Sequence, residues 1–211
     1  MATTPFVLYT NPMSRGRMAR WMLEETGLPY DTVLLDYGTS MKAADYLAIN
    51  PMGKVPALVH GDAVVTEVAA IGLYLADLVP DKQLAPPLGS PERGGYYRWI
   101  SFMAPLEQLM MAKHVGALGD PASAGYGTEK DLLGTLEAAI GDRQHLIGDG
   151  FTMADLVVAG NLGFYLQFGM LEPRDAFVRF ARLHQARPAA KRAAAVDDGL
   201  VAQAKAGKAD A

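Results

Sequence analysis

Cysteine is absent from the 211 residues of this sequence. Without a thiol the chain cannot form disulfides, thiolate metal sites or a cysteine nucleophile, so these three kinds of chemistry are excluded together. The histidines His60, His114, His145 and His184 lie far apart in the sequence and match no metal-ligand spacing, so no metal site is predicted. A chain without disulfides is compatible with a reducing compartment, and we expect a cytoplasmic protein.

Long apolar runs and long runs of one charge are missing as well. The most apolar long window, residues 153–170, is interrupted by Asp155, Asn161 and Gln167, which indicates a buried helix and no membrane span. The first residues lack the basic and apolar regions of a signal peptide and are expected to lead into a strand. The formal net charge of −4 is spread over both halves, so nothing indicates nucleic acid as a partner. We therefore expect a soluble protein.

The composition indicates a packed globule, and the sequence contains two kinds of pattern, strand signals and helix signals. Half of the residues are hydrophobic and 20% are charged, which is typical of a folded domain. Strand signals occur only in the first third, where the order β-α-β-α-β-β-α is predicted. The expected strands lie near residues 6–9, 30–35, 57–59 and 63–65, and the expected helices near residues 17–26, 42–49 and 67–79, with Thr66 as a helix cap.

Beyond about residue 90 every periodic segment indicates a helix. Ser90 and Pro91 predict the N-cap and first position of the first of these helices. The expected helices cover residues 96–115, 129–146, 175–187 and the tail from 188, together with one opened by a capping box at Thr152 and Asp155. The predicted fold class is thus α/β plus all-α, with a small domain at 1–80, a linker at 81–90 and a helical domain at 91–211.

One stretch, "NPMGKVPAL" at residues 50–58, combines two prolines and a glycine within seven residues and then returns to an apolar run. Proline removes a backbone donor, so this is no ordinary strand. One interpretation is a turn that enters an edge strand. The other is a cis bond between Val55 and Pro56, which would turn the preceding backbone groups outward for a peptide-like ligand.

Four stretches together resemble the glutathione transferase family, and the resemblance covers most of the chain. They are "LYTNPMSRGRMARWMLEETGLPY", "NPMGKVPAL", "TEVAAIGLYLAD" and "FTMADLVVAG". Their order and spacing carry the resemblance, because no one stretch is specific alone. It implies an N-terminal thioredoxin-like domain, a C-terminal helical bundle and a homodimer. The implied activity is conjugation of the thiolate of glutathione, the co-substrate, to small hydrophobic electrophiles in detoxification.

The resemblance also assigns residues to the glutathione site. Pro56 matches a cis proline, and the backbone of Val55 would pair with the cysteinyl part of glutathione. Lys42 would face the glycyl carboxylate, and Lys54 would border the peptide backbone. Each lysine could equally be an ordinary solvated charge.

Glu67 matches the first residue of a Glu-Ser pair that holds the γ-glutamyl group in this family. A carboxylate in the first turn of a helix is also favoured by the helix dipole alone, so Glu67 has a purely structural interpretation too. Val68 departs from the pattern, because it has no hydroxyl. Its backbone N–H can still meet a carboxylate, and we expect weakened binding of glutathione.

Activation of the thiol needs a hydroxyl or amide donor near the sulfur. A free thiol has a pKa of about 8.5, and a donor together with a helix N-terminus can lower it. Ser14 stands after the first strand at the head of a helix and resembles the serine-using members best, while Tyr9 and Asn11 are alternatives. Ser14 could also serve only as a helix cap.

The electrophile is expected to lie against the helical domain. The candidates share helical spacing and apolar or aromatic character, and they are Trp99, Met103, Met110, His114 and Tyr165. Such a stripe is often core instead of pocket. Two other functions stay open, a binding or interaction module with little catalysis and a glutathione-dependent peroxidase or isomerase. The absence of cysteine argues against reductase chemistry that needs a protein thiol.

Overall fold

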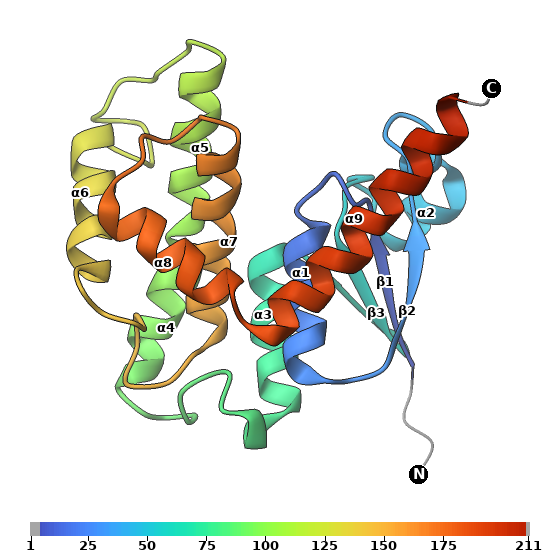
Figure 1. The fold of residues 1–211 in the computed structure, drawn as a ribbon, viewed down its shortest axis with the longest axis horizontal. Coiled ribbons are helices and arrows are strands. Elements are labelled where there is room, and N and C mark those ends of the chain that lie inside the picture. Colours follow the sequence, from blue (N-terminus) through green and yellow to red (C-terminus); the bar gives the residue numbers. More distant parts are fainter. Residues whose placement is uncertain (1–4, 210–211) are drawn as a thin grey trace. The chain divides into compact units, whose positions relative to one another are not determined.

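The computed structural model describes residues 5–209, which form two compact units (Figure 1). The first unit comprises the described residues up to Lys82 together with those from Arg187 onward, and the second comprises Gln83–Ala186. The sequence predicted a helical domain from residue 91 to residue 211. The compact units instead group the last helix with the N-terminal sheet.

The first unit is built on a mixed sheet with the strand order β2-β1-β3-β4. Its strands are β1 (Phe6–Thr10), β2 (Tyr30–Leu34), β3 (Ala57–His60) and β4 (Ala63–Thr66). β1 pairs in parallel with β2 and antiparallel with β3, and β3 pairs antiparallel with β4. The order of elements predicted from the sequence is confirmed, and with it the thioredoxin-like class of this unit.

Helices cover this sheet in the first unit. They are α1 (Gly16–Thr26), η1 (Ser40–Lys42), α2 (Ala44–Ile49), α3 (Val68–Leu78), η2 (Pro80–Lys82) and α9 (Pro188–Ala209). α1 ends, as predicted, at Gly27, whose φ of 71° is the left-handed conformation that glycine adopts without a Cβ penalty. α9 lies along α1, which also packs on α3 (Figure 1).

The start of α3 differs from the prediction. Thr66 is the last residue of β4 and does not cap the helix, because Glu67 occupies the N-cap position and α3 begins at Val68. No side chain caps this helix. The N–H groups of its first turn therefore lack a partner within the helix.

The second unit is helical. It consists of α4 (Glu92–Ser101), α5 (Met103–His114), α6 (Glu129–Ile140), α7 (Met153–Gln167) and α8 (Asp175–Gln185). The prediction of one helix over 96–115 was wrong, since the chain breaks at Phe102 between α4 and α5. Pro105 explains the break, because proline has no N–H for the carbonyl four residues earlier and is tolerated in a first helical turn.

Two further helix ends in this unit also differ from prediction. α6 stops at Ile140 and not at residue 146, because Gly141 adopts a positive φ of 43°. The N-cap of α4 is Pro91 and not Ser90. Within residues 5–209, no helix is both long enough and apolar enough to cross a membrane.

Candidate functional site

Three chain segments meet at one edge of the sheet in the first unit. The pairing of Tyr9 with Ala57 and of Ala57 with Thr66 brings the end of β1, the start of β3 and the end of β4 side by side. The turn that carries Ser14 follows β1, the Val55–Pro56 bond precedes β3, and Glu67 follows β4. The register alone therefore gathers the main predicted site segments at this edge.

The Val55–Pro56 peptide bond is cis, as the resemblance implied. The Lys54 carbonyl just before it accepts hydrogen bonds from the Tyr46 hydroxyl and from the Asn50 side-chain amide, the latter at 2.8 Å. Burial raises the pKa of Tyr46, which keeps its phenol protonated as a donor. Among the described residues, neither the N–H nor the C=O of Val55 has a hydrogen-bonding partner. The backbone is thus held in place with both groups open to a ligand.

Glu67 has a strained backbone. Its φ is 65° and its ψ is 124°, a conformation that side chains with a Cβ rarely adopt. Such strain costs about 1–3 kcal/mol and is typical of functional sites. The exposed carboxylate of Glu67 has no hydrogen-bonding partner within the described part of the chain. The unpaired N–H groups that begin with Val68 lie next to it, and they form the kind of helix start that binds anions.

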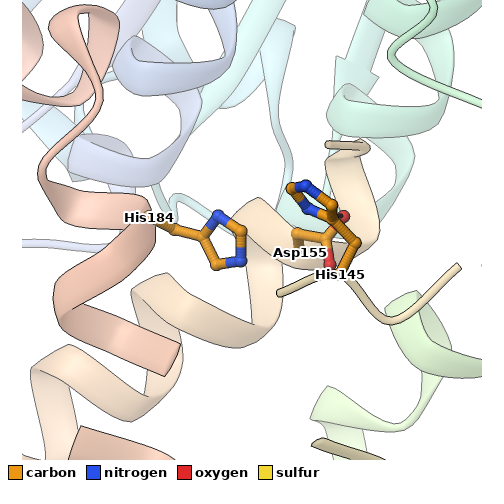
Figure 2. Close-up of side chains that lie close together, drawn as sticks. All are labelled: His145, Asp155 and His184. Atoms are coloured by element: carbon orange, nitrogen blue, oxygen red, sulfur yellow. Dashed lines mark ion pairs between the residues drawn. The ribbon is translucent and has the colours of Figure 1, made fainter. Parts of the chain in front are cut away.

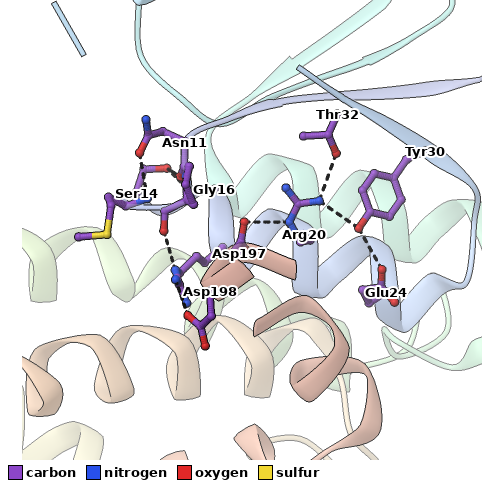
Figure 3. Close-up of polar contacts among 12 residues, drawn as sticks. Asn11, Ser14, Gly16, Arg20, Glu24, Tyr30, Thr32, Asp197 and Asp198 are labelled. Atoms are coloured by element: carbon purple, nitrogen blue, oxygen red, sulfur yellow. Dashed lines mark hydrogen bonds and ion pairs between the residues drawn. The ribbon is translucent and has the colours of Figure 1, made fainter. Parts of the chain in front are cut away.

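Ser14 stands in a tight turn between β1 and α1 (Figure 3). Its hydroxyl donates to the carbonyl of Asn11 at 2.6 Å and accepts from the N–H of Gly16 at 2.9 Å. Arg15, and not Ser14, occupies the N-cap position of α1. The Ser14 hydroxyl therefore supports the turn at both ends, and it must rotate away from Asn11 to donate to another group.

Gly16 allows this turn to lie close to the strand. A Cβ at residue 16 would stand 1.8 Å from the Thr10 hydroxyl oxygen, a distance that no real pair of atoms tolerates. Glycine is required here by close approach. As a result α1 begins in close contact with Thr10, the last residue of β1.

The other two candidates for thiol activation differ in how they are held. The Asn11 amide group donates to the Leu35 carbonyl at 2.7 Å, and its oxygen accepts from the N–H of Met13 at 2.9 Å, so both ends of this side chain are engaged. Tyr9 packs against Tyr46, with ring centroids 5.6 Å apart. Its hydroxyl has no partner among residues 5–209. Tyr9 thus stays open as an alternative to Ser14.

The two lysines also differ. Lys42 donates from Nζ to the carbonyl of Met52 at 2.9 Å and so braces the turn that precedes Val55. The exposed ammonium of Lys54 has no partner among the side chains that the structure describes. Sequence reasoning did not anticipate the contacts that Tyr46 on α2 and Asn50, the C-cap of α2, make with the Lys54 carbonyl.

The predicted electrophile-site residues lie in the second unit. Four of them are buried and His114 is exposed; the buried ones are Trp99, Met103, Met110 and Tyr165. Trp99 packs edge-on against Phe102 and carries the guanidinium of Arg98 over its ring at 4.4 Å. An open hollow of about 830 Å³, lined mainly by the end of α7, by residues 169–173 and by α8, includes none of these five residues. Their role stays a prediction.

Folding brings together three residues that are separated in the sequence, His145, Asp155 and His184 (Figure 2). Each can offer one ligand atom, and these atoms lie within 4.8 Å of one another. Sequence reasoning missed the cluster because its members lie on different segments with no characteristic spacing.

The Asp155 carboxylate of this cluster is engaged in hydrogen bonds at the start of α7. One oxygen accepts from the N–H of Leu146 at 2.7 Å, and the other accepts from the N–H and the hydroxyl of Thr152 at 2.8 and 3.0 Å. The predicted capping box of α7 is thereby confirmed. Nε2 of His184 lies 2.9 Å from the carbonyl of Gln144 and can only donate to it. These hydrogen bonds give Asp155 a structural role at the start of α7 and fix the orientation of the His184 ring.

Comparison with known proteins gives consistent matches. Residues 13–78 match the family model described as glutathione S-transferase, N-terminal domain. Glutathione S-transferase 3 of Zea mays is 34% identical over 165 residues, which cover 72% of this chain and 74% of that protein. A glutathione transferase structure from Methylococcus capsulatus has a TM-score of 0.78 and 28% identity, with 92% of this chain and 98% of that chain covered. A sphingomonad glutathione S-transferase complexed with glutathione has a TM-score of 0.74 and 26% identity, with 91% and 98% covered.

Proposed function

The chain belongs to the glutathione S-transferase family and is a glutathione transferase, and we propose that the sheet edge described above binds glutathione and joins its thiolate to small hydrophobic electrophiles. One observation supports this best. The strand register brings the Ser14 turn, the open backbone of Val55 and the strained Glu67 to the same edge of one sheet. A hydroxyl donor, an extended pairing edge and an anion-binding helix start are the three features that a thiol tripeptide with charged ends requires.

Each part of glutathione has a matching group. The cysteinyl backbone pairs with the free N–H and C=O of Val55, next to cis Pro56. The γ-glutamyl ammonium is bound by the Glu67 carboxylate, and the γ-glutamyl carboxylate by the N–H groups at the start of α3, including that of Val68. The glycyl carboxylate is bound by Lys54, whose ammonium has no partner in the described chain, or by Lys42.

The chemical step begins with loss of the thiol proton to solvent. The Ser14 hydroxyl turns from the Asn11 carbonyl toward the sulfur and donates a hydrogen bond to the thiolate, while the N-terminal N–H groups of α1 add positive potential. A decrease in thiol pKa by about two units corresponds to about 2.7 kcal/mol. The thiolate then attacks the electrophilic carbon, and the sulfur–carbon bond forms as the leaving group departs. Tyr9 is the alternative donor.

The electrophile site, the assembly and the location are also proposals. We assign the electrophile wall to Trp99, Met103, Met110, His114 and Tyr165, which the sequence predicted. A detoxification role in the cytoplasm agrees with the supply of reduced glutathione there. The family resemblance supports a C2 homodimer, in which the same patch of both chains meets. Sedimentation equilibrium at micromolar concentration should give twice the chain mass of 22.6 kDa.

The proposed function is tested by binding and turnover measured on the same sample. Calorimetry with glutathione should give saturable binding with a stoichiometry of one per chain, and conjugation with an aryl halide should be catalysed by the glutathione-bound protein. Binding without any turnover would replace the transferase by a binding module. The absence of binding would reject the site itself.

A further inference from the structure

The last helix is fastened to the first by a buried ion pair (Figure 3). Nε of Arg20 on α1 donates to the Asp197 carboxylate on α9 at 3.0 Å, and the side chains are 2% and 0% exposed. The same guanidinium also donates to the hydroxyls of Tyr30 and Thr32, at 3.3 and 3.1 Å. Because this pair is buried and Arg20 also bonds to β2, the position of α9 along α1 is fixed. The position of the next residue of α9, Asp198, is fixed with it.

Asp198 reaches the turn that carries Ser14 through one arginine. The Asp198 carboxylate accepts from a terminal nitrogen of Arg17 at 2.7 Å, and Nε of Arg17 donates to the carbonyl of Pro12 at 2.6 Å. Pro12 lies inside the turn that is closed by the hydrogen bond from the N–H of Ser14 to Asn11. A continuous chain of hydrogen bonds thus runs from the C-terminal helix to the turn that presents the candidate hydroxyl.

The Arg17–Asp198 pair is too exposed to contribute much to stability. Its side chains are 37% and 68% exposed, and ion pairs of this kind add little to the free energy of folding. Its effect is geometric, because the planar guanidinium orients two donors in a fixed fork. When Asp198 accepts a hydrogen bond from a terminal nitrogen of Arg17, Nε of Arg17 is directed at the Pro12 carbonyl.

We propose that Asp198 is a positioning residue for thiol activation, which acts through Arg17 and Pro12 on the Ser14 turn. The proposal rests on the proposed function of this site. Without Asp198 the Arg17 side chain is free to leave the Pro12 carbonyl, so the turn samples more conformations and the Ser14 hydroxyl spends less time at the sulfur.

The direction of the change in thiol pKa distinguishes a positioning role of Asp198 from a direct effect of its charge. The positive charges around this turn and on the facing parts of α1 and α9 are Arg15, Arg17, Arg20 and Arg192, and the negative charges are Glu24, Glu67, Asp197 and Asp198. Removal of the negative charge of Asp198 would by itself favour a nearby thiolate and lower the thiol pKa. Loss of positioning weakens the hydrogen bond to the thiolate and raises the thiol pKa.

The experiment compares Asp198→Asn, Asp198→Glu, Arg17→Gln and the double variant Arg17→Gln/Asp198→Asn. Thiolate absorbance of bound glutathione and conjugation with an aryl halide are both followed against pH. We expect Asp198→Asn to raise the thiol pKa by about half a pH unit and to lower kcat/KM about threefold at a pH well below that pKa, where the thiolate fraction falls in proportion. The loss of rate should disappear at a pH where the thiol is fully ionised, and Asp198→Glu should retain most of the activity.

A double-mutant comparison tests the route through Arg17. If Asp198 acts only through this arginine, the double variant should match Arg17→Gln. Arg192→Gln is the matched control, because it removes another exposed ion pair between α9 and α1, to Glu24, without touching the turn. Its pH profile should equal that of the unmodified protein.

Three results would overturn the proposal: an unchanged thiol pKa in Asp198→Asn, a lowered one, or an equal shift in Arg192→Gln. Failure of the proposed function is recognised separately, because the unmodified protein would then neither bind glutathione nor lower the pKa of the glutathione thiol. A purely structural role would lower the thermal midpoint and leave the pH profile in place.

Discussion

At the scale of single residues, the Ser14 hydroxyl illustrates how one group can serve both fold and chemistry. It holds the turn by accepting from Gly16, while its hydrogen points to the Asn11 carbonyl. Rotation about one bond redirects the hydrogen and leaves the oxygen free to keep accepting. Ser14 is not the N-cap of α1, but its support of the turn and its proposed role as a donor are compatible in this geometry.

Ser14→Ala should separate these two roles. Loss of the acceptor for Gly16 should lower the free energy of unfolding by about 0.5–2 kcal/mol. If the hydroxyl supplies most of a shift of about two units, kcat/KM at pH 7 should fall roughly tenfold or more and the thiolate titration should move to higher pH. Spectroscopic titration and steady-state kinetics measure both.

Tyr9→Phe is the control for Ser14→Ala, since it removes the hydroxyl that has no partner in the described chain while keeping the ring against Tyr46. Its rate and thiolate titration should stay close to those of the unmodified protein. A large loss in Tyr9→Phe together with a normal rate in Ser14→Ala would transfer the role of donor to Tyr9.

Glu67 is predicted to lower the stability of the fold while it contributes to glutathione binding. Its positive φ is strained for a residue with a Cβ, so Glu67→Gly should leave the free energy of unfolding unchanged or raise it by up to about 1 kcal/mol. The same change removes the carboxylate and should weaken glutathione binding by about 1–3 kcal/mol. Chemical denaturation and calorimetry measure the two effects.

Glu67→Gln is the matched variant for this prediction, because it keeps the strain and the shape but loses the charge. It should weaken binding without any gain in stability. Glu67→Gly binding glutathione as tightly as the unmodified protein would remove this carboxylate from the site.

At the scale of elements, the start of α7 depends on one buried carboxylate. Asp155 accepts hydrogen bonds from the N–H groups of Leu146 and Thr152 and from the Thr152 hydroxyl. Asp155→Ala would leave buried donors without partners, each at a cost of about 1–3 kcal/mol, in addition to the loss of the cap. We expect the free energy of unfolding to fall by about 2–5 kcal/mol in denaturant titrations.

Thr152→Ser provides the comparison for Asp155→Ala, since it keeps the hydroxyl and the N–H that meet the carboxylate. It should cost less than half as much as Asp155→Ala. Equal costs for the two variants would mean that packing, and not the hydrogen bonds of the carboxylate, accounts for the stability of this helix start.

The elements could be predicted from sequence wherever a local signal dominates. The strand near residues 6–9, the helix near residues 17–26 and the capping box of α7 each depend on neighbouring residues, and each is confirmed. Errors arose where a weaker local signal was overlooked. Pro105 separates α4 from α5, and Gly141 ends α6 earlier than apolar periodicity indicated.

The candidate site could be predicted only in part, for a different physical reason. Cis Pro56 was implied by a recognisable local pattern. The bracing of Lys54 by Tyr46, and the reach of Asp198 to Arg17, depend on tertiary contacts that no spacing along the chain encodes. Second-layer residues of this kind become visible only when the fold is known.

At the scale of the whole chain, the contact between α1 and α9 joins its N-terminal and C-terminal parts. α9 follows the second unit in sequence but packs along α1 of the first, so the first unit includes residues that come last in the sequence. The Arg20–Asp197 pair lies in this junction and is buried on both sides. Burial of two charges is stabilising only when each retains its partner.

Asp197→Asn should therefore destabilise the protein far more than the same change at the next residue. The substitution keeps the size of the side chain but leaves the buried Arg20 guanidinium without its counter-charge, which should cost about 3–5 kcal/mol in the free energy of unfolding. Asp198→Asn breaks only an exposed pair and should cost at most about 1 kcal/mol. Denaturant titrations of both variants measure the difference. Equal and small losses would mean that α9 is held by its apolar contacts with α1, and that the buried ion pair fixes its position along the helix without adding to its stability.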